Sequence, residues 1–471
     1  MLSKDETEVI HATSIQVLEK IGIEIDNEQA LRILREVGAT VDFKKKLAYV
    51  LEVLVKEALH KTPSEVRLYS LDGKQTLSFS GSNVYFNPGA TAPYMLDIET
   101  MEIRRPTSED FTDFVRVTDA LEYIHAQSTA MLPCDVPSAI ADRYRLYIML
   151  KNSVKPMIAG AFTVEGLYDM KKMLGIVVGG ESALRKRPPL LMDVCPSPPL
   201  KWSLQTSQNL IDSAKFDIPL EIIPAPQLGS TAPVTLAGLL VQHNAEFLSG
   251  LVIAELVKAG VSVVYSGSPS VMDMRYGTGC VGNIEVCMLS AAYAQIARFY
   301  GIPSGAYLGM SETKLVDAQT GLESANGIIL GTLAGINCIT GPGMLAFENC
   351  QSYEKLVIDN EICGMALRLA RNITVNEETL AFDLIKKVGP GGHFLSQKHT
   401  LKWFQIEEYM PSSVIDKMSK AQWERTGAKD VLERAKEHVD KILKEHHPKP
   451  LQPNVEKELD SFMTEILKRQ K

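Results

Sequence analysis

The spacing of hydrophobic positions changes twice along this chain and divides it into three parts. Apolar side chains recur at helical spacing from Ile10 to Ile21, and a second helical pattern follows Asn27, a favourable N-cap residue. From Val66 to Ile103 the pattern becomes short runs separated by turn residues such as Asp72–Gly73. Residues 1–106 are therefore predicted to form an N-terminal extension of helices and a small antiparallel sheet.

A repeating pattern begins after Pro106. Thr107 and Asp110 have the spacing of a capping box, which predicts the start of a helix. Short apolar runs then recur, mostly every thirty to forty residues, and each is followed by a loop and an amphipathic stretch. Seven such runs lie near residues 123, 155, 189, 219, 261, 303 and 336, and GGHFLSQ near residue 391 could provide an eighth.

This repeat has the length of one βα unit, and near-continuous apolar runs are typical of buried parallel strands. Eight units favour an α/β fold with a (β/α)8 TIM-type barrel over residues 107–411; an open doubly wound sheet is the alternative. Residues 412–471 are rich in Lys and Glu and are predicted to form C-terminal helices. We expect these helices to pack on the barrel or against a second subunit, which favours a homo-oligomer.

Composition excludes several classes of protein. The formal net charge is −8 and no basic face dominates, which argues against a nucleic-acid partner. The N-terminus has no apolar stretch of signal-peptide length, and no window of 18 apolar residues lacks a charge, so neither secretion nor membrane insertion is expected. The seven cysteines have no framework spacing, which indicates reduced thiols. A soluble, cytoplasmic protein is expected.

The common cofactor and nucleophile motifs are missing from the expected positions. No G-x-G-x-x-G follows the first predicted barrel strand, and G-x-x-x-x-G-K-[ST], C-x-x-C, H-E-x-x-H and G-x-S-x-G do not occur. His393 and His399 are the only close histidine pair in the barrel region, and they lack helical i, i+4 spacing. We therefore expect no metal site, no bound cofactor and no catalytic nucleophile in this chain.

Polar and aromatic residues follow the predicted barrel strands. Chemistry in an α/β barrel takes place at the carboxyl ends of the strands, so these residues are expected to share one mouth. Aromatic members of the set could line a pocket for an organic cation. Structural roles are also open: Tyr265 and Tyr307 could fill the barrel, Arg275 could pair with Asp273, and Glu348 could cap a helix. The set includes Asp193, Tyr265, Arg275, Tyr307, Glu348, His393 and Phe394.

Several ordered motifs resemble the trimethylamine methyltransferase superfamily over nearly the whole chain. They are MDMRYGTGCVGNIE (272–285), GMSETKLVDAQTGLE (309–323), SYEKLVIDNEICGMALR (352–368) and GPGGHFLSQKHT (389–400), with IHATSIQVLEKIGIEI and YFNPGATAPYMLD near the N-terminus. Founding members of that family carry pyrrolysine in the barrel. This sequence has only the twenty standard residues, so it resembles the branch without pyrrolysine.

The resemblance implies a methyltransferase that demethylates a quaternary amine. Glycine betaine is the expected substrate, with proline betaine, carnitine and γ-butyrobetaine as alternatives. It also implies that the methyl group passes to Co(I) of a separate corrinoid protein, which docks at the barrel mouth, in anaerobic one-carbon metabolism. A quaternary-amine binding barrel without turnover and a metal-dependent hydrolase are rival hypotheses.

The resemblance also gives the candidate residues expected roles. The positive charge is lost as the methyl group leaves, so a pocket that held the cation too tightly would favour the substrate over the transition state. A modest cation pocket is therefore expected, formed by Tyr265, Tyr307, Phe394 and Tyr94. Asp193 or Glu348 is expected to supply the counter-charge, and Arg275 or His393 to bind the substrate carboxylate. No residue is assigned as catalytic.

Overall fold

A computed structural model describes residues 1–469. The N-terminal part contains α1 (Lys4–Gln16), α2 (Glu28–Glu36) and α3 (Glu52–Lys61) with the short strands β1 (Ile23–Ile25), β2 (Thr40–Asp42) and β3 (Leu47–Tyr49). Asn27 caps α2, because its side chain accepts hydrogen bonds from two backbone N–H groups, so the predicted start is confirmed. A strand from further along the chain, β12 (Lys201–Trp202), extends this sheet.

A hairpin follows this unit. Strands β4 (Val66–Tyr69) and β5 (Thr76–Phe79) pair antiparallel on either side of the predicted Asp72–Gly73 turn, where Gly73 has a φ of 70°. The hairpin packs its apolar face against the second residues of the parallel strands, such as Ile158 and Leu191. It therefore covers the amino-terminal ends of those strands and leaves their carboxyl ends for other residues.

Eight parallel strands form the centre of the molecule in two sheets. The first sheet has the order β15 (Val263–Tyr265), β13 (Leu220–Ile222), β11 (Leu190–Val194), β10 (Met157–Gly160), β9 (Gln127–Ser128). The second has the order β18 (Gly305–Tyr307), β19 (Cys338–Thr340), β6 (Tyr85–Asn87). A parallel bridge between Tyr265 and Ser304 links one pair of edges, and the His125 N–H donates to the Phe86 carbonyl (2.7 Å) at the other. This arrangement is consistent with a TIM-type barrel.

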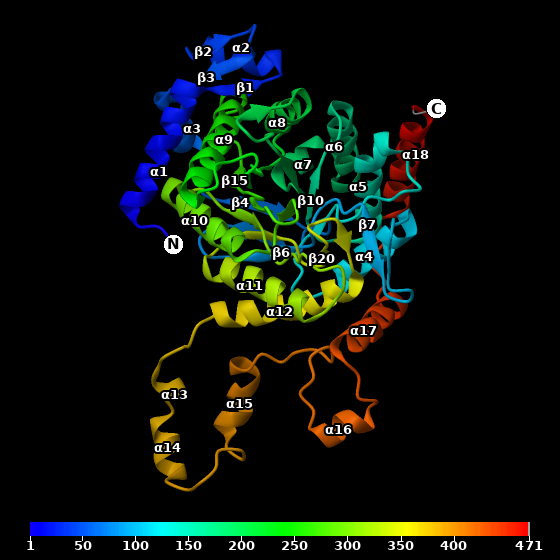
Figure 1. Cartoon of the computed structure of the whole chain (residues 1–471). Helices are drawn as coiled ribbons and strands as arrows, with labels where there is room; N and C mark the ends of the chain where they lie inside the picture. Colours follow the sequence, from blue (N-terminus) through cyan, green and yellow to red (C-terminus); the bar gives the residue numbers. More distant parts are fainter. Residues whose placement is uncertain (470–471) are drawn as a thin grey trace.

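Helices connect the strands and surround them (Figure 1). They are α4 (Ser108–Ala120), α5 (Ala141–Asn152), α6 (Val164–Val178), α7 (Glu181–Lys186), α8 (Leu204–Phe216), α9 (Leu236–Val257), α10 (Ile284–Tyr300), α11 (Ala318–Leu333) and α12 (Tyr353–Ala370). The capping box predicted for α4 at Thr107 and Asp110 is present. By length and composition α9 alone among the described helices could cross a membrane, but 72% of its most apolar window is buried in the protein.

One of the eight strands differs from the sequence prediction. GGHFLSQ near residue 391 forms turns and no strand, whereas β6 pairs in parallel with β19, with Asn87 opposite Thr340. The NVYFNPG segment lies among hairpin strands in the sequence, and only its partner more than two hundred residues away makes it part of the parallel sheet. The division of the chain at residues 106 and 411 stays a prediction.

Short strands lie beyond the carboxyl ends of the parallel strands. Strand β14 (Gln227–Leu228) pairs with the hairpin of β16 (Ser270–Asp273) and β17 (Thr278–Cys280). A second small sheet has the order β20 (Met344–Leu345), β21 (Cys350–Gln351), β7 (Tyr94–Asp97), β8 (Glu102–Arg104). These elements form the rim around the strand ends.

The C-terminal region is helical, as the sequence predicts. It contains α13 (Glu377–Leu380), α14 (Phe382–Val388), α15 (Lys398–Glu407), α16 (Lys420–Arg425), α17 (Val431–Glu445) and α18 (Pro453–Arg469). Helices α17 and α18 pack on the body, and α17 buries Ala435 and Val439. Helices α13 to α16 instead project away from the body (Figure 1).

Candidate functional site at the strand ends

Two carboxyl groups lie side by side inside the parallel strands. Asp193 of β11 and Glu221 of β13 are register partners on adjacent strands. Leu191, two residues before Asp193, packs against the inner hairpin, so alternation along the strand turns Asp193 toward the same interior. Glu221 is fully buried, and a Cβ built on Gly305 of β18 would lie 2.4 Å from its Oε1. Both acids therefore face the centre of the site.

These carboxyl groups have unused hydrogen-bonding capacity. Both oxygens of Glu221, Oδ1 of Asp193 and Oγ of the neighbouring Ser266 are buried without a hydrogen-bond partner among residues 1–469. Buried polar atoms normally have partners, so a group of them in one place indicates a binding site. Burial raises the pKa of Glu221 to about 7. Burial, and next the charge of Glu221, raise the pKa of Asp193 well above its ordinary value. Such a pair holds a proton near neutral pH.

Tyr307 and Glu348 belong to the same neighbourhood. Tyr307 of β18 is 6% exposed and packs with Ile223, Met310 and Met344. Burial raises its pKa, and the charges of Asp193, Glu221 and Glu348 add to the effect. Glu348 is only half-buried, yet desolvation raises its pKa to about 8. Its accessible surface therefore faces a recess in the protein rather than bulk solvent.

A strained turn carries Glu348. Ala346, Phe347 and Glu348 have φ angles of 50°, 59° and 68°, a left-handed conformation that costs roughly 1 kcal/mol or more for each such residue. Two backbone hydrogen bonds maintain it: Ala346 N–H donates to the Thr313 carbonyl (2.8 Å) and Phe347 N–H to that of Ser311 (3.3 Å). Strain of this kind is common at functional sites because it fixes a side chain in place.

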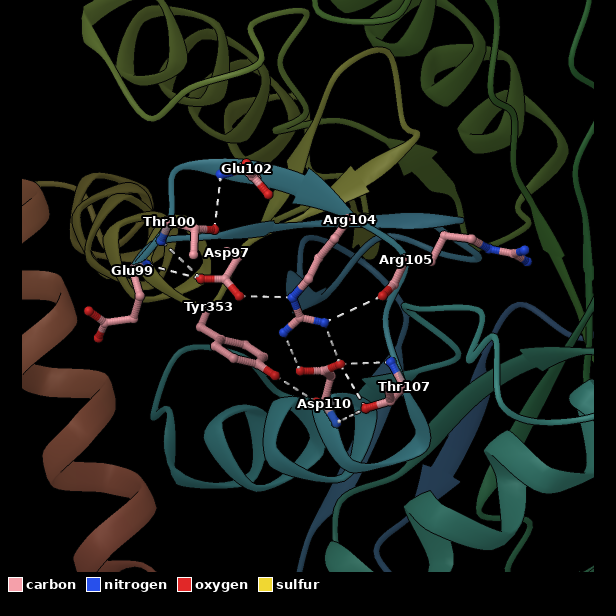
Figure 2. Close-up of polar contacts among 9 residues, drawn as sticks. All are labelled: Asp97, Glu99, Thr100, Glu102, Arg104, Arg105, Thr107, Asp110 and Tyr353. Carbon is pink, nitrogen blue, oxygen red and sulfur yellow. Dashed lines mark hydrogen bonds and ion pairs between the residues drawn. The ribbon is translucent and has the colours of Figure 1, made fainter.

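Arg104 fastens the rim sheet behind this turn to the body (Figure 2). Its guanidinium donates to Asp97 at 2.8 Å and, through two nitrogens at 2.8 Å each, to both oxygens of Asp110 at the start of α4. The Tyr353 hydroxyl of α12 donates to the Asp110 carbonyl oxygen at 2.8 Å. Strand β7 of this hairpin pairs with β21, which directly follows the Glu348 turn. Arg104 therefore supports the position of Glu348 from outside.

A buried cation lies beside the acids. Arg145 of α5 is fully buried, and its Nη1 donates to the Thr129 carbonyl oxygen (2.9 Å) and the Thr91 hydroxyl (3.1 Å). Its Cζ lies 4.7 Å from the centre of the Phe162 ring. Nη2 has no partner within the described part of the chain. Burial lowers the pKa of Arg145 to about 10, opposed by the charges of Asp142 and Asp193, so it remains charged at neutral pH.

Five of the eight residues predicted to bind substrate lie elsewhere. The hydroxyl of Tyr265 donates to Asn244 of α9 (3.0 Å), so its ring points outward between strand and helices. Arg275 is exposed and pairs with Asp273 (2.7 Å). Tyr94 is 44% exposed on β7. His393 and Phe394 lie between α14 and α15, in the part that projects from the body (Figure 1).

The structure thus brings together Asp193, Tyr307 and Glu348 and adds two residues that sequence reasoning missed. Glu221 stands alone as a charge within the apolar run PLEII, and Arg145 stands before the apolar run LYIML. For Glu221, a single charge inside an apolar run was the available signal, because burying it is costly unless it has a function or a partner. Within residues 1–469, no three His, Cys, Asp or Glu side chains are arranged to hold a metal ion.

Comparison with known proteins identifies the family of this chain. The family model of trimethylamine methyltransferase (MTTB) matches residues 1–470. A glycine betaine methyltransferase of Desulfitobacterium hafniense is 33% identical over 470 residues, 99% of this chain and 96% of the relative. A trimethylamine methyltransferase MttB of the same species is 34% identical over 98% of this chain and 93% of its own length. Trimethylamine methyltransferase MttB of Methanosarcina thermophila is also 34% identical, over 98% of this chain and 96% of its own length.

A solved structure shares the fold. The crystal structure of the Methanosarcina barkeri monomethylamine methyltransferase (MtmB) covers 94% of this chain and 88% of its own, with a TM-score of 0.58 and 12% identity. At this identity the similarity concerns the α/β architecture alone.

Proposed function

Because this chain belongs to the trimethylamine methyltransferase (MTTB) family and is a methyltransferase, we propose that it demethylates a quaternary amine and passes the methyl group to the cobalt of a separate corrinoid protein. Glycine betaine is the first candidate substrate. One observation carries this choice: a buried arginine, Arg145, has a free Nη2, feels the charge of Asp193 and lies against the Phe162 ring. That set complements a small molecule with a carboxylate and a cationic nitrogen.

We propose that the two parallel sheets form one closed (β/α)8 barrel. The Tyr265–Ser304 bridge and the hydrogen bond from His125 to Phe86 join their edges on both sides and support this. The barrel then takes β6 as one of its strands, so it draws one strand from residues 1–106, which the sequence assigned to the N-terminal extension. The amino-terminal hairpin blocks one end, so substrate and corrinoid protein approach the opposite mouth, where the carboxyl ends of the strands lie.

The quaternary nitrogen is assigned to Asp193, Glu221, Glu348 and Tyr307. A trimethylammonium group has no N–H, so it needs nearby negative charge and an aromatic face rather than hydrogen-bond acceptors. The unpartnered carboxyl oxygens of Asp193 and Glu221 fit this requirement. The substrate carboxylate is assigned to Nη2 of Arg145, which takes the role that the sequence gave to Arg275 or His393.

The reaction needs a strong nucleophile and correct alignment. The C–N bond breaks and nitrogen keeps its electron pair. Glycine betaine thereby becomes dimethylglycine, whose nitrogen is uncharged. The electron pair that forms the new bond to the methyl carbon comes from Co(I) of the partner protein. This chain binds and orients the methyl group toward the mouth. A carboxyl pair that retains a proton holds the cation moderately, which limits stabilisation of the substrate over the transition state.

Related substrates and a different class of function are the alternatives. Proline betaine, carnitine and γ-butyrobetaine also combine a carboxylate with a quaternary nitrogen, at different separations. A quaternary-amine binding barrel without turnover would use the same residues. We further propose that the protein acts in the cytoplasm, as a homo-oligomer, in anaerobic one-carbon metabolism, and that the corrinoid belongs to its partner.

The test is an anaerobic assay of purified protein with free Co(I) cobalamin. We expect glycine betaine to convert Co(I) to methyl-Co(III), followed by absorbance, and dimethylglycine to appear in equal amount. Trimethylamine, proline betaine, carnitine and γ-butyrobetaine are run in parallel and identify the substrate if glycine betaine fails. Methylation from trimethylamine alone would overturn the proposal of a quaternary substrate. Binding without methyl transfer to cobalamin or to a corrinoid protein would favour the binding barrel.

A further inference from the structure

Residues 371–406 form an arm that leaves the body at the end of α12 (Figure 1). The arm comprises α13, α14 and most of α15, and none of these helices contains a buried residue. The body has buried residues in every longer helix, so this segment has no core of its own.

The base of the arm is firmly attached. Arg368 of α12 donates from Nε to the Glu407 carbonyl oxygen (2.7 Å) and from Nη2 to its carboxylate (2.9 Å). The Tyr409 hydroxyl donates to Glu361 of α12 (2.8 Å). Both ends of the arm are therefore attached to α12. The arm is a segment anchored at its two ends.

The arm also has internal order. Trp403 of α15 donates through Nε1 to the Glu378 carboxylate of α13 (3.3 Å), and Lys402 pairs with the same carboxylate. The Thr400 hydroxyl donates to the Phe394 carbonyl oxygen (2.7 Å). Yet α13, α14 and α15 have only 4, 7 and 10 residues, and isolated helices of such length are marginal in water. The arm therefore needs a surface to pack against.

Its side chains are suited to such packing. The most exposed apolar ones are Ile373, Val375, Phe382, Leu395 and Leu401, each between 72% and 86% exposed. With the arm's other large apolar residues they expose on the order of 1,000 Å², taking roughly 150–200 Å² per large side chain. A standard protein interface buries about 800 Å² on each partner. The arm has the area of an interface.

Charge distinguishes the arm from the rest of the chain. The arm carries +2, from five basic and three acidic residues, while the whole chain carries −8, which leaves −10 on the remainder. A basic, apolar arm complements the acidic body of another copy of this chain. The arm's charged residues are Arg371, Lys386, Lys387, Lys398 and Lys402 against Glu377, Glu378 and Asp383.

We propose that the arm of residues 371–406 docks on the body of a second copy of this chain and holds the homo-oligomer together. The GPGGHFLSQKHT segment, with His393 and Phe394, then belongs to a subunit interface. This explains why these two residues lie far from the acids of their own chain. The inference does not depend on the substrate or on methyl transfer.

The test measures the mass of the full-length protein in solution by light scattering at micromolar concentration. We expect a dimer or larger closed assembly for the unmodified chain. The double variant L395D/L401D places two charges on the arm and should shift the protein to monomers. Val9→Asp changes an exposed apolar residue on α1, outside the arm, and should leave the mass unchanged. Circular dichroism of each variant checks that the body remains folded.

A second variant avoids the apolar residues. Replacing Lys386 and Lys387 by Glu reverses charge on the arm without enlarging or removing its apolar surface. We expect the concentration for half-dissociation at low salt to rise tenfold or more, and the difference to shrink at high salt. An unmodified chain that is monomeric at tens of micromolar would overturn the proposal, as would L395D/L401D that remains fully associated. Protection of arm amides from hydrogen exchange only after addition of a corrinoid protein would assign the arm to that partner instead.

Discussion

Asp193 and Glu221 lie directly opposite each other on adjacent parallel strands, with unpartnered carboxyl oxygens inside the protein. Burial raises the pKa of both acids because it penalises the ionised forms, and the charge of Glu221 raises that of Asp193 further. A bound cation would offset both effects. The pair therefore links protonation to the binding of a quaternary amine, and that link can be measured.

The affinity for glycine betaine should rise as the pH increases through about 7. Below that pH Glu221 is protonated and gives the cation little attraction, whereas above it Glu221 ionises. Isothermal titration at pH 6, 7 and 8 should give a Kd that falls as the pH rises. Because binding releases protons, the measured heat should depend on the buffer. The variant Glu221→Gln should bind roughly tenfold more weakly at pH 8, about 1.4 kcal/mol, and show a flatter profile. An affinity that is independent of pH would contradict the link.

Glu221→Gln should change the dependence of stability on pH. The folded-state pKa of about 7 lies above the ordinary 4.5, so Glu221 favours the folded state fully below the lower value. That contribution is lost as the pH rises toward and through 7, by on the order of 3 kcal/mol. Gln mimics the protonated acid, so the variant should lose less stability between pH 5 and 8.

The measurement is the free energy of unfolding in urea at both pH values. Glu36→Gln, at an exposed carboxylate, serves as the control and should follow the unmodified protein. Equal pH profiles for Glu221→Gln and the control would show that Glu221 ionises normally.

Arg145→Lys should weaken binding of the substrate carboxylate without changing binding of the cationic nitrogen. Lysine keeps the charge but cannot reproduce the planar set of donors that reaches Thr91 and Thr129 while leaving Nη2 free. Affinity for glycine betaine should fall about tenfold or more, a loss in the range of one charge-assisted hydrogen bond. Tetramethylammonium has no carboxylate, and its affinity should be unchanged. An equal loss for both ligands would assign Arg145 a structural role only.

Tyr307 and Tyr265 form a matched pair for testing the cation pocket. Tyr307→Leu removes an aromatic face near the acids and should weaken tetramethylammonium binding by about five- to thirtyfold, as expected for a desolvated cation–π contact. Tyr265→Phe removes only the hydroxyl that bonds Asn244 outside the site. It should lower the free energy of unfolding by about 1 kcal/mol and leave affinity unchanged. Weaker binding in Tyr265→Phe with normal binding in Tyr307→Leu would reverse the assignment.

Arg104→Lys should weaken the attachment of the rim sheet. Lysine retains the charge but loses the two-point contact with Asp110 and the simultaneous bond to Asp97 (Figure 2). Because Arg104 is partly exposed, we expect a cost of only about 1 kcal/mol in urea unfolding. Arg105→Lys, at the exposed neighbour, should cost nothing measurable. The same loss in both variants would argue that the contact with Asp110 does not stabilise the sheet.

The pattern of the sequence predicted most of the secondary structure. The capped starts of α2 and α4, the β4–β5 hairpin and seven of the parallel strands follow from short-range spacing and turn chemistry. Strand β6 could not be predicted as a parallel strand, because its only distinguishing feature is its pairing with β19. GGHFLSQ resembled a strand because two apolar residues stand between glycines, although the segment forms turns.

The candidate site was predictable only in part. Position after a strand selected Asp193, Tyr307 and Glu348, and the charges of the two acids act on Tyr307 in the structure. It could not tell that Tyr265 points outward, because adjacent strand residues face opposite sides and the register was unknown. Arg145 comes from a helix and reaches the strand ends only through the packing of α5, so no rule about strand ends could include it.

By itself, the sequence determined the elements, the family resemblance and the types of residue available for chemistry, since these depend on local spacing and on motif order. Only the tertiary structure decided which side chains meet. The contacts between Asp193 and Glu221, between Glu221 and Gly305, and between Arg145 and the ends of β6 and β9 join positions far apart in the chain. The same is true of the arm, whose exposed apolar surface becomes apparent only when the body is seen to leave it uncovered. Burial and proximity, which set the pKa values and the charge of the site, are properties of the packed chain.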